Sequence, residues 1–318
     1  MNREFGVIIF TLVLVILVGL VVYTRYSTWQ LEQKYPPRGR FIEFDGSTIH
    51  YTKKGEGHPL VLLHGASSNS LDYESSIGPV LAKIFQVIVI DRPGLGHSTR
   101  KNGKWLTPLD QANLVREVLR KENIEQPVLV GHSWSAALVL SYLLHYPSEV
   151  AAAVLITPAT HSWDSPPALY NRISRIPLIG TLLAYTAVLP FGRHFVDEGI
   201  KSVFFDGEIP KSYRRKTGTD LLLRPHSWLA NADDLSLLNQ YLKYQEQFYD
   251  WIKHPMLAII GDHDKVVSNE IHTDSLSQQA KHLEVVELPQ MGHAPHHSAP
   301  DSVVSSIVSF VHRLKKAA

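Results

Sequence analysis

An apolar strand, a turn of small residues and an apolar helix follow one another in residues 126–147, which read QPVLVGHSWSAALVLSYLLHYP. The turn contains Ser133, with Gly131 two positions before it and Ser135 two positions after it. A serine on so sharp a turn needs small neighbours at these positions, because the strand and the helix approach each other closely there. The turn also directs backbone N–H groups and a helix N-terminus toward a developing negative charge. Ser133 is therefore a candidate nucleophile.

Two later loops supply the groups that such a serine needs. A serine hydroxyl attacks well only when a nearby base takes its proton and a third group orients that base. The loop after the apolar run 256–260 reads GDHD over residues 261–264, and the loop after the run 283–288 contains His293. Because each loop leaves a predicted parallel strand, we expect these groups and Ser133 at one edge of a sheet, where open α/β folds bind ligands.

The rest of the chain alternates apolar runs with helical patterns. Residues 41–45 and 48–52 alternate around the turn Asp45-Gly46, which predicts a hairpin. The later runs do not alternate, as expected for strands buried on both faces of a parallel sheet; they are 60–63, 87–90, 128–130, 152–156, 256–260 and 283–288. Helical patterns separate them at 71–84, 108–122, 136–146, 269–281 and 301–315. The pattern predicts an α/β fold with a mostly parallel sheet and helices on both faces.

The alternation stops between residues 159 and 251, where aromatic, proline and leucine clusters occur without a convincing parallel strand. This interval is predicted to be a helical insertion. The expected organisation is a membrane anchor at 1–25, a stiff polar linker at 26–40, a core at 41–158 and 252–318, and the insertion at 159–251.

Four features in sequence order resemble those of the α/β-hydrolase superfamily, and the resemblance extends from Phe41 to the C-terminus. They are HGAS at 64–67 after the third strand, DRPGLGHS at 91–98 after the fourth, the turn around Ser133, and the pair of loops at 261–264 and 292–293. Ser135 departs from the family pattern, which has glycine at that position, but serine is small enough to fit.

The resemblance implies a role for each site residue. Ser133 would be the nucleophile, His293 the general base and Asp264 the acid that orients it, and the N–H groups of Ala66 and Trp134 would form the oxyanion hole. The insertion would be the family's cap domain. The family needs no metal or cofactor, and none is expected here.

Two alternatives concern the same loops. Asp262 is a rival for the role of the acid, and the family's usual spacing of three residues after the glycine selects Asp264. A metal site formed by His293, His296 and His297 with residues 262–264 is disfavoured, because the chain has no His-Glu-x-x-His or similar run.

Acyl transfer to water is the expected reaction. Epoxide hydrolases and haloalkane dehalogenases use an aspartate in place of Ser133, and a serine in their chemistry would leave an ether that water cannot cleave, whereas an acyl-serine ester is hydrolysable. The expected enzyme is an esterase or lipase-like serine hydrolase. Carbon–carbon bond hydrolases and iminopeptidases also use serine on this fold and remain alternatives, as does a non-catalytic receptor for hydrophobic ligands.

Composition excludes other functions. The 318 residues contain 31 Lys and Arg against 30 Asp and Glu, so no broad field attracts nucleic acid. The chain has no cysteine, which excludes thiolate catalysis and disulfides. The expected partners are a small-molecule acyl substrate and a membrane.

The N-terminal region contains an uncharged run, residues 6–23, that reads GVIIFTLVLVILVGLVVY and would extend about 27 Å as a helix. We expect an uncleaved single-pass anchor rather than a signal peptide, because no small-x-small site follows the run. One basic residue precedes the run and four follow it by position 40, which favours a cytoplasmic catalytic domain. A second apolar segment, 178–191, either packs against the pocket or forms an apolar entrance or membrane-dipping lid. These features favour a lipophilic acyl ester as substrate.

Overall fold

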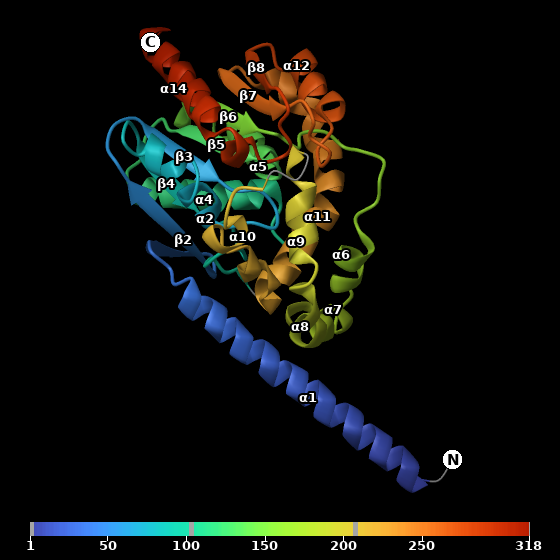
Figure 1. The fold of residues 1–318 in the computed structure, drawn as a ribbon. Coiled ribbons are helices and arrows are strands. Elements are labelled where there is room, and N and C mark those ends of the chain that lie inside the picture. Colours follow the sequence, from blue (N-terminus) through green and yellow to red (C-terminus); the bar gives the residue numbers. More distant parts are fainter. Residues whose placement is uncertain (1–2, 102–104, 206–208, 318) are drawn as a thin grey trace.

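The computed structural model describes residues 3–101, 105–205 and 209–317, and in these residues eight strands form one sheet (Figure 1). The strand order is β1-β2-β4-β3-β5-β6-β7-β8. Strand β2 (Ser47–Lys54) pairs antiparallel with β1 (Arg40–Phe44) and with β4 (Gln86–Ile90). All other pairs are parallel and join β3 (Pro59–Leu63), β4, β5 (Val128–His132), β6 (Ala152–Ile156), β7 (Met256–Gly261) and β8 (Leu283–Leu288). The predicted α/β fold is confirmed.

Helices cover both faces of the sheet, because its central strands bury alternate side chains on opposite sides. In β3, Val61 and Leu63 pack with α4 (Pro108–Lys121) and α5 (Ser135–His145). Leu60 and Leu62 pack on the other face with α3 (Gly78–Leu81) and α14 (Pro300–Ala317). The apolar runs of the central strands therefore have no exposed face. The prediction that the run 283–288 is buried on both faces is wrong, because β8 lies at the edge of the sheet and exposes Glu284, Val285 and Glu287.

Two predicted helices differ in the structure. The stretch 71–84 forms two short helices, α2 (Leu71–Glu74) and α3, because Pro79 has no N–H with which to continue a helix from residue 75. The stretch 269–281 forms a π-helical turn, η7 (Glu270–Asp274), followed by α12 (Ser275–Gln279).

The described residues between β6 and β7 form helices and no strand, as predicted. They include α6 (Leu169–Ser174), α7 (Ile179–Leu183), the π-helical turn η3 (Ala184–Val188), α8 (Leu189–Gly192), α9 (Val196–Ser202), α10 (Tyr213–Lys216) and α11 (Pro225–Gln245). The second half of α11 packs into the main core through Leu238 and Leu242. The insertion therefore shares its last helix with the core.

The N-terminal region is one helix, α1 (Arg3–Lys34), which extends from the domain as a long rod (Figure 1). The prediction of a linker beginning at residue 26 is therefore wrong for residues 26–34. Thr24, Ser27, Leu31 and Tyr35 are buried at helical spacing, and Leu31 and Tyr35 pack against Leu189 and two further leucines, Leu221 and Leu223. Contact with the insertion keeps the chain helical up to the Pro36-Pro37 pair, which is incompatible with a continuing helix.

In the described residues, α1 is the one helix long and apolar enough to cross a membrane, with a mean hydropathy of 3.2 over its most apolar window. A membrane span and a signal sequence both fit this finding.

A buried ion cluster ties α11 to the core. The carboxylate of Asp234 accepts hydrogen bonds from the guanidinium groups of Arg92 and Arg100, and all three side chains are almost fully buried. Gln111 also donates to Asp234, at 3.3 Å. Burial lowers the pKa of Arg92 to about 10, with Asp234 opposing the effect, so the guanidinium stays charged at neutral pH. This group of residues is called the Asp234 cluster below.

We predict that Asp234→Ala lowers the free energy of unfolding by about 3–5 kcal/mol, because it leaves two buried guanidinium groups without their carboxylate. The neighbouring substitution Asp233→Ala is the matched control. It breaks the half-exposed ion pair with Arg175, of 3.0 Å, and is expected to cost about 0–1 kcal/mol. Denaturant unfolding measures both variants, and equal losses would show that the cluster does not hold α11.

Candidate active site

The turn after β5 holds Ser133 in the left-handed backbone region, with φ of 52°. A serine in this region is strained, and close packing maintains the conformation. A Cβ atom at Gly131 would lie 2.7 Å from the carbonyl oxygen of Ser135, and one at Gly65 would lie 2.9 Å from Nδ1 of His132. The N–H of Ser133 donates to the carbonyl of Ile156 in β6, at 2.9 Å. Small neighbours therefore allow the turn, as the sequence predicts.

Ser135 stands where the family pattern has glycine, and its hydroxyl has a defined partner. Its Oγ donates to the carbonyl oxygen of His64, at 2.5 Å, and both residues are fully buried. The extra side chain thus links the start of α5 to the loop that carries Ala66.

His293 connects Ser133 with Asp264. Its Nε2 lies 2.8 Å from Oγ of Ser133, and its Nδ1 lies 2.7 Å from Oδ2 of Asp264. A carboxylate accepts from an N–H, so Nδ1 carries the proton and Nε2 is free to accept the serine proton. The other oxygen of Asp264 accepts from the N–H groups of Val266 and Val267, at 2.8 and 3.0 Å, which fixes the carboxylate.

The backbone of His293 is held by three elements. Its N–H donates to the carbonyl of Val203, just after α9, at 2.9 Å. Its carbonyl accepts from Oγ1 of Thr157 at 3.0 Å and from Nε2 of His132 at 2.9 Å. The imidazole therefore stands on a loop supported by the insertion, by β6 and by the turn of Ser133.

Asp262 takes part in other contacts. Its Oδ1 accepts from the N–H of Met291, at 3.2 Å, and lies 2.8 Å from Nδ1 of His263. Its side chain is partly exposed, whereas that of Asp264 is fully buried. The geometry places Asp264, and not Asp262, against His293.

The N–H groups of Ala66 and Trp134 are the expected oxyanion donors. In the part of the chain that the structure describes, the N–H groups of Ala66 and Trp134 donate to no protein acceptor. The loop of Ala66 is fixed by His64, whose Nε2 accepts from the N–H of Arg92 at 2.9 Å and whose Nδ1 donates to the carbonyl of Gly65 at 2.8 Å. Burial, assisted by the charge of Arg92, lowers the pKa of His64 to about 4, so this imidazole is neutral. Both N–H groups are thus available to a ligand.

The side chain of Trp134 is buried beneath the turn. The guanidinium of Arg92 lies 3.6 Å from the centre of its ring, and its Nε1–H donates to the backbone carbonyl of Asp234 at 3.0 Å. Only 1% of this residue is exposed. The indole therefore joins the turn to the Asp234 cluster and offers no apolar surface to a substrate.

The remaining histidines of these loops form a separate cluster around Asp72. Nε2 of His296 and Nε2 of His297 lie 3.0 and 2.7 Å from the two oxygens of Asp72. Donor atoms of Asp72, His132 and His296 lie within 4.8 Å of one another, so among the residues that the structure describes these three could hold a metal. The imagined site with His293 does not form, because His293 faces Ser133 and Asp264. Sequence reasoning missed Asp72, which is more than 200 positions from its partners.

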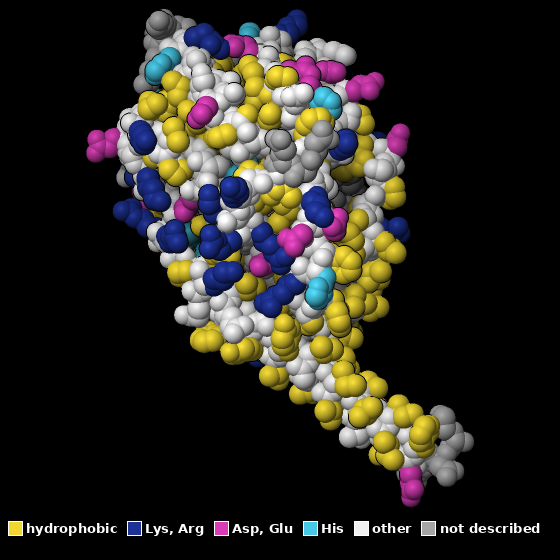
Figure 2. All heavy atoms as spheres, in the orientation of Figure 1, with side chains coloured by type: hydrophobic (Ala, Val, Ile, Leu, Met, Phe, Trp, Pro, Cys, Tyr) yellow, Lys and Arg dark blue, Asp and Glu magenta, His cyan; other side chains and the backbone are white. Residues whose placement is uncertain are grey.

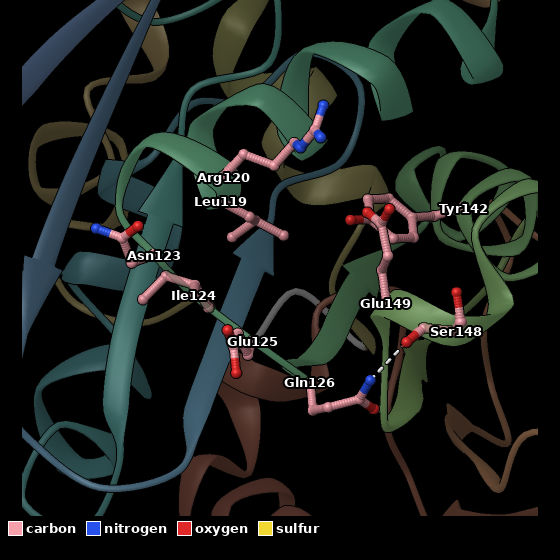
Figure 3. Close-up of a pocket in the computed structure, with 9 residues that line it drawn as sticks. All are labelled: Leu119, Arg120, Asn123, Ile124, Glu125, Gln126, Tyr142, Ser148 and Glu149. Carbon is pink, nitrogen blue, oxygen red and sulfur yellow. Dashed lines mark hydrogen bonds between the residues drawn. The ribbon is translucent and has the colours of Figure 1, made fainter.

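A surface hollow of about 400 Å³ lies away from Ser133 (Figure 3). Residues 123–126, which precede β5, and Ser148 and Glu149, which precede β6, line it. It therefore lies at the amino ends of the strands, whereas Ser133 follows the carboxyl end of β5. A second hollow, of about 270 Å³, borders His296, His297 and α10.

Comparisons with known proteins identify the family of this chain. Residues 58–300 match the family described as alpha/beta hydrolase fold. The proline iminopeptidase of Heyndrickxia coagulans is 25% identical over 296 residues, which cover 86% of this chain and 98% of that protein. The cis-3-alkyl-4-alkyloxetan-2-one decarboxylase of Shewanella oneidensis is 30% identical over 158 residues, 48% of this chain and about half of that protein's length, 49%.

A solved structure of a thermophilic esterase from Thermogutta terrifontis has a TM-score of 0.68 to this chain, with 18% sequence identity. The match covers 87% of this chain and 99% of the esterase. At this identity the likeness concerns the fold alone.

We predict that Asp264→Asn lowers kcat/KM by about 10⁴-fold, because the amide favours the wrong tautomer of His293. Asp262→Asn is the matched control on the same loop, and it should change kcat/KM far less, since Asp262 contacts Met291 and His263. Steady-state hydrolysis of p-nitrophenyl esters measures both variants. The reverse ranking would assign the orienting carboxylate to Asp262.

Proposed function

Because the chain belongs to the α/β-hydrolase fold family, we propose that it is a serine hydrolase that cleaves carboxylic esters through an acyl-enzyme intermediate. The contact of 2.8 Å between Oγ of Ser133 and Nε2 of His293 carries the proposal, since it joins a strained, partly accessible serine to a base oriented by a buried carboxylate. The order and spacing of these residues along the chain support the same roles.

Acylation begins when Oγ of Ser133 attacks the carbonyl carbon of the ester and its proton passes to Nε2 of His293. Asp264 stabilises the imidazolium through Nδ1, at 2.7 Å. The oxyanion of the tetrahedral intermediate accepts hydrogen bonds from the N–H groups of Ala66 and Trp134. The carbon–oxygen bond to the alcohol then breaks, and the alcohol leaves with the proton from Nε2.

Deacylation repeats these steps with water. Nε2 of His293 removes a proton from the water as its oxygen attacks the acyl carbon of the Ser133 ester. The second tetrahedral intermediate collapses, Oγ recovers the proton from Nε2, and the carboxylic acid leaves. Every proton moves through one nitrogen, so neither half of the reaction requires a cofactor.

We propose esters with a lipophilic acyl group as the substrate class. The support comes from α1 and the insertion, not from the turn of Ser133. The apolar helix α1 packs against the insertion, and the insertion also contacts the loop of His293 through Val203. A hydrolase tethered to a bilayer meets lipophilic esters at high local concentration, whereas polar substrates gain nothing from the tether.

We predict that Ser133→Ala reduces ester turnover by at least about 10³-fold and abolishes covalent labelling by a fluorophosphonate. The unlabelled variant must retain the thermal midpoint of the parent chain, which excludes misfolding as the cause. Labelling at Ser133 in the parent requires an activated serine and would exclude the non-catalytic receptor. An equally active Ser133→Ala chain would contradict the serine mechanism.

A series of p-nitrophenyl esters from acetate to palmitate tests the acyl group. We expect medium-chain esters to exceed acetate in kcat/KM by about 10- to 200-fold, because apolar pockets supply about 1–3 kcal/mol of discrimination. Prolyl and other aminoacyl p-nitroanilides are the comparison set. Faster cleavage of an N-terminal prolyl substrate than of any ester would favour an iminopeptidase, and a steady fall beyond acetate would contradict the lipophilic substrate.

A further inference from the structure

The apolar run of α1 is free along only part of its length. Residues 6–16 are exposed on all sides, whereas Leu17, Leu20 and Val21 are half-buried and Thr24 is fully buried. A helix of residues 6–16 extends about 16 Å, roughly half of the 30 Å hydrocarbon core of a bilayer. If α1 crosses a bilayer, the hydrocarbon core must therefore also contain residues 17–23, which lie where α1 contacts the insertion.

The insertion presents an apolar surface at that level. The turn η3 and helix α8 contact α1, and α8 lies beside its middle (Figure 1). Large hydrophobic side chains of this region are exposed, among them Leu169, Tyr170, Leu178, Leu182, Phe191 and Phe195. We call these six residues the apolar cap face. Soluble monomers rarely expose large apolar patches, and such patches mark interaction sites.

Leu178 is the extreme case on this face. Its side chain is 85% exposed, and its backbone is left-handed, with φ of 65°. Exposure of a leucine side chain to water costs free energy, and a positive φ is sterically unfavourable for a bulky side chain. Both features are consistent with a side chain that points out of the protein into an apolar phase.

The charge of the segment fits a lipid surface. Residues 165–196 contain Arg172, Arg175 and Arg193 but no Asp or Glu. In the described part of the chain, neither Arg172 nor Arg193 forms an ion pair with a carboxylate, and Arg193 instead donates to the hydroxyl of Tyr23 in α1, at 3.4 Å. Figure 2 shows hydrophobic side chains continuing from α1 onto the adjoining end of the domain, with Lys and Arg beyond them. Basic residues bordering an apolar face are typical of interfacial membrane segments.

We propose that the apolar cap face inserts into the leaflet from which α1 emerges, with Arg172 and Arg193 among anionic phospholipid headgroups. The bilayer, and not a second copy of the chain, is the occupant, because the apolar run of α1 is long enough to span it only when the cap face lies at its surface. The inference rests on retention of α1 as a membrane span and does not depend on the proposed ester chemistry.

Single-cysteine labelling tests the proposal without interference, because the chain has no native cysteine. Leu178→Cys and Phe191→Cys carry an environment-sensitive nitrobenzoxadiazole label. Val285→Cys in β8, 43% exposed, is the matched control on the core, and Val15→Cys reports on α1. The full-length variants are reconstituted into vesicles of phosphatidylcholine and phosphatidylglycerol, with or without lipids that carry a doxyl quencher high on the acyl chain.

We expect the labels at 178 and 191 to shift their emission to shorter wavelength and to be quenched by the doxyl lipids, while the label at 285 shows neither change. Thermal unfolding of each labelled chain must match that of the parent. The proposal would be overturned if the labels at 178 and 191 showed neither a blue shift nor quenching while the label at 15 showed both. A blue shift without quenching would reveal contact with another protein copy and would overturn it too, as would a water-exposed label at 15.

No readout in this experiment depends on turnover. Loss of the proposed ester chemistry would leave the labelling result unchanged, and a failure of cap insertion would leave esterase activity in detergent unchanged.

Discussion

The close approach of β5 and α5 at Ser133 constrains much of the surrounding structure. The left-handed backbone at this serine, with φ of 52°, requires glycine at 131 and leaves no space for a Cβ atom at 65. Ser135 then bonds the carbonyl of His64, and His64 accepts from the backbone N–H of Arg92. One strained turn is thus joined by hydrogen bonds to the loops that follow β3 and β4, where the proposed oxyanion site and the Asp234 cluster begin.

Arg92 extends this connection into the insertion. Its guanidinium lies against the ring of Trp134 and pairs with Asp234 of α11, and its pKa of about 10 keeps it charged despite burial. Separating α11 from the core would therefore leave an unpaired buried charge, which costs several kcal/mol. We therefore expect α11 to remain packed on the core, although it lies between β6 and β7 in the sequence.

The sequence predicts features that depend on local pattern and strand order. Buried strands read as apolar runs, and Ser133, Asp264 and His293 follow three of them, so their meeting at one sheet edge follows from topology. Contacts between distant segments leave no such pattern. Asp72 and Asp234 read as ordinary helix residues, and each acquires its partners only through tertiary packing.

The linker prediction was wrong for a related reason. Thr24 and Ser27 are small and polar, so hydropathy does not place them on one buried helix face with Leu31. Close packing of α1 against the insertion nevertheless buries all three side chains. Small side chains allow helices to approach closely, which hydropathy does not register. The same limitation applies to Trp134, whose buried indole under the turn is not indicated by its position next to Ser133 in the sequence.

Helix α9 joins the two ends of the molecule on which the proposals depend. Phe195, at its start, belongs to the apolar cap face, and the carbonyl of Val203, just after its end, accepts from the N–H of His293 at 2.9 Å. The helix has seven residues and spans about 10 Å, so a surface inserted in a leaflet would stand only two helical turns from the proposed catalytic base. An ester that entered from the lipid phase beside α9 would therefore have little water to cross. In the proposed arrangement, α1 as a membrane span and the apolar cap face would both bring lipophilic esters close to Ser133.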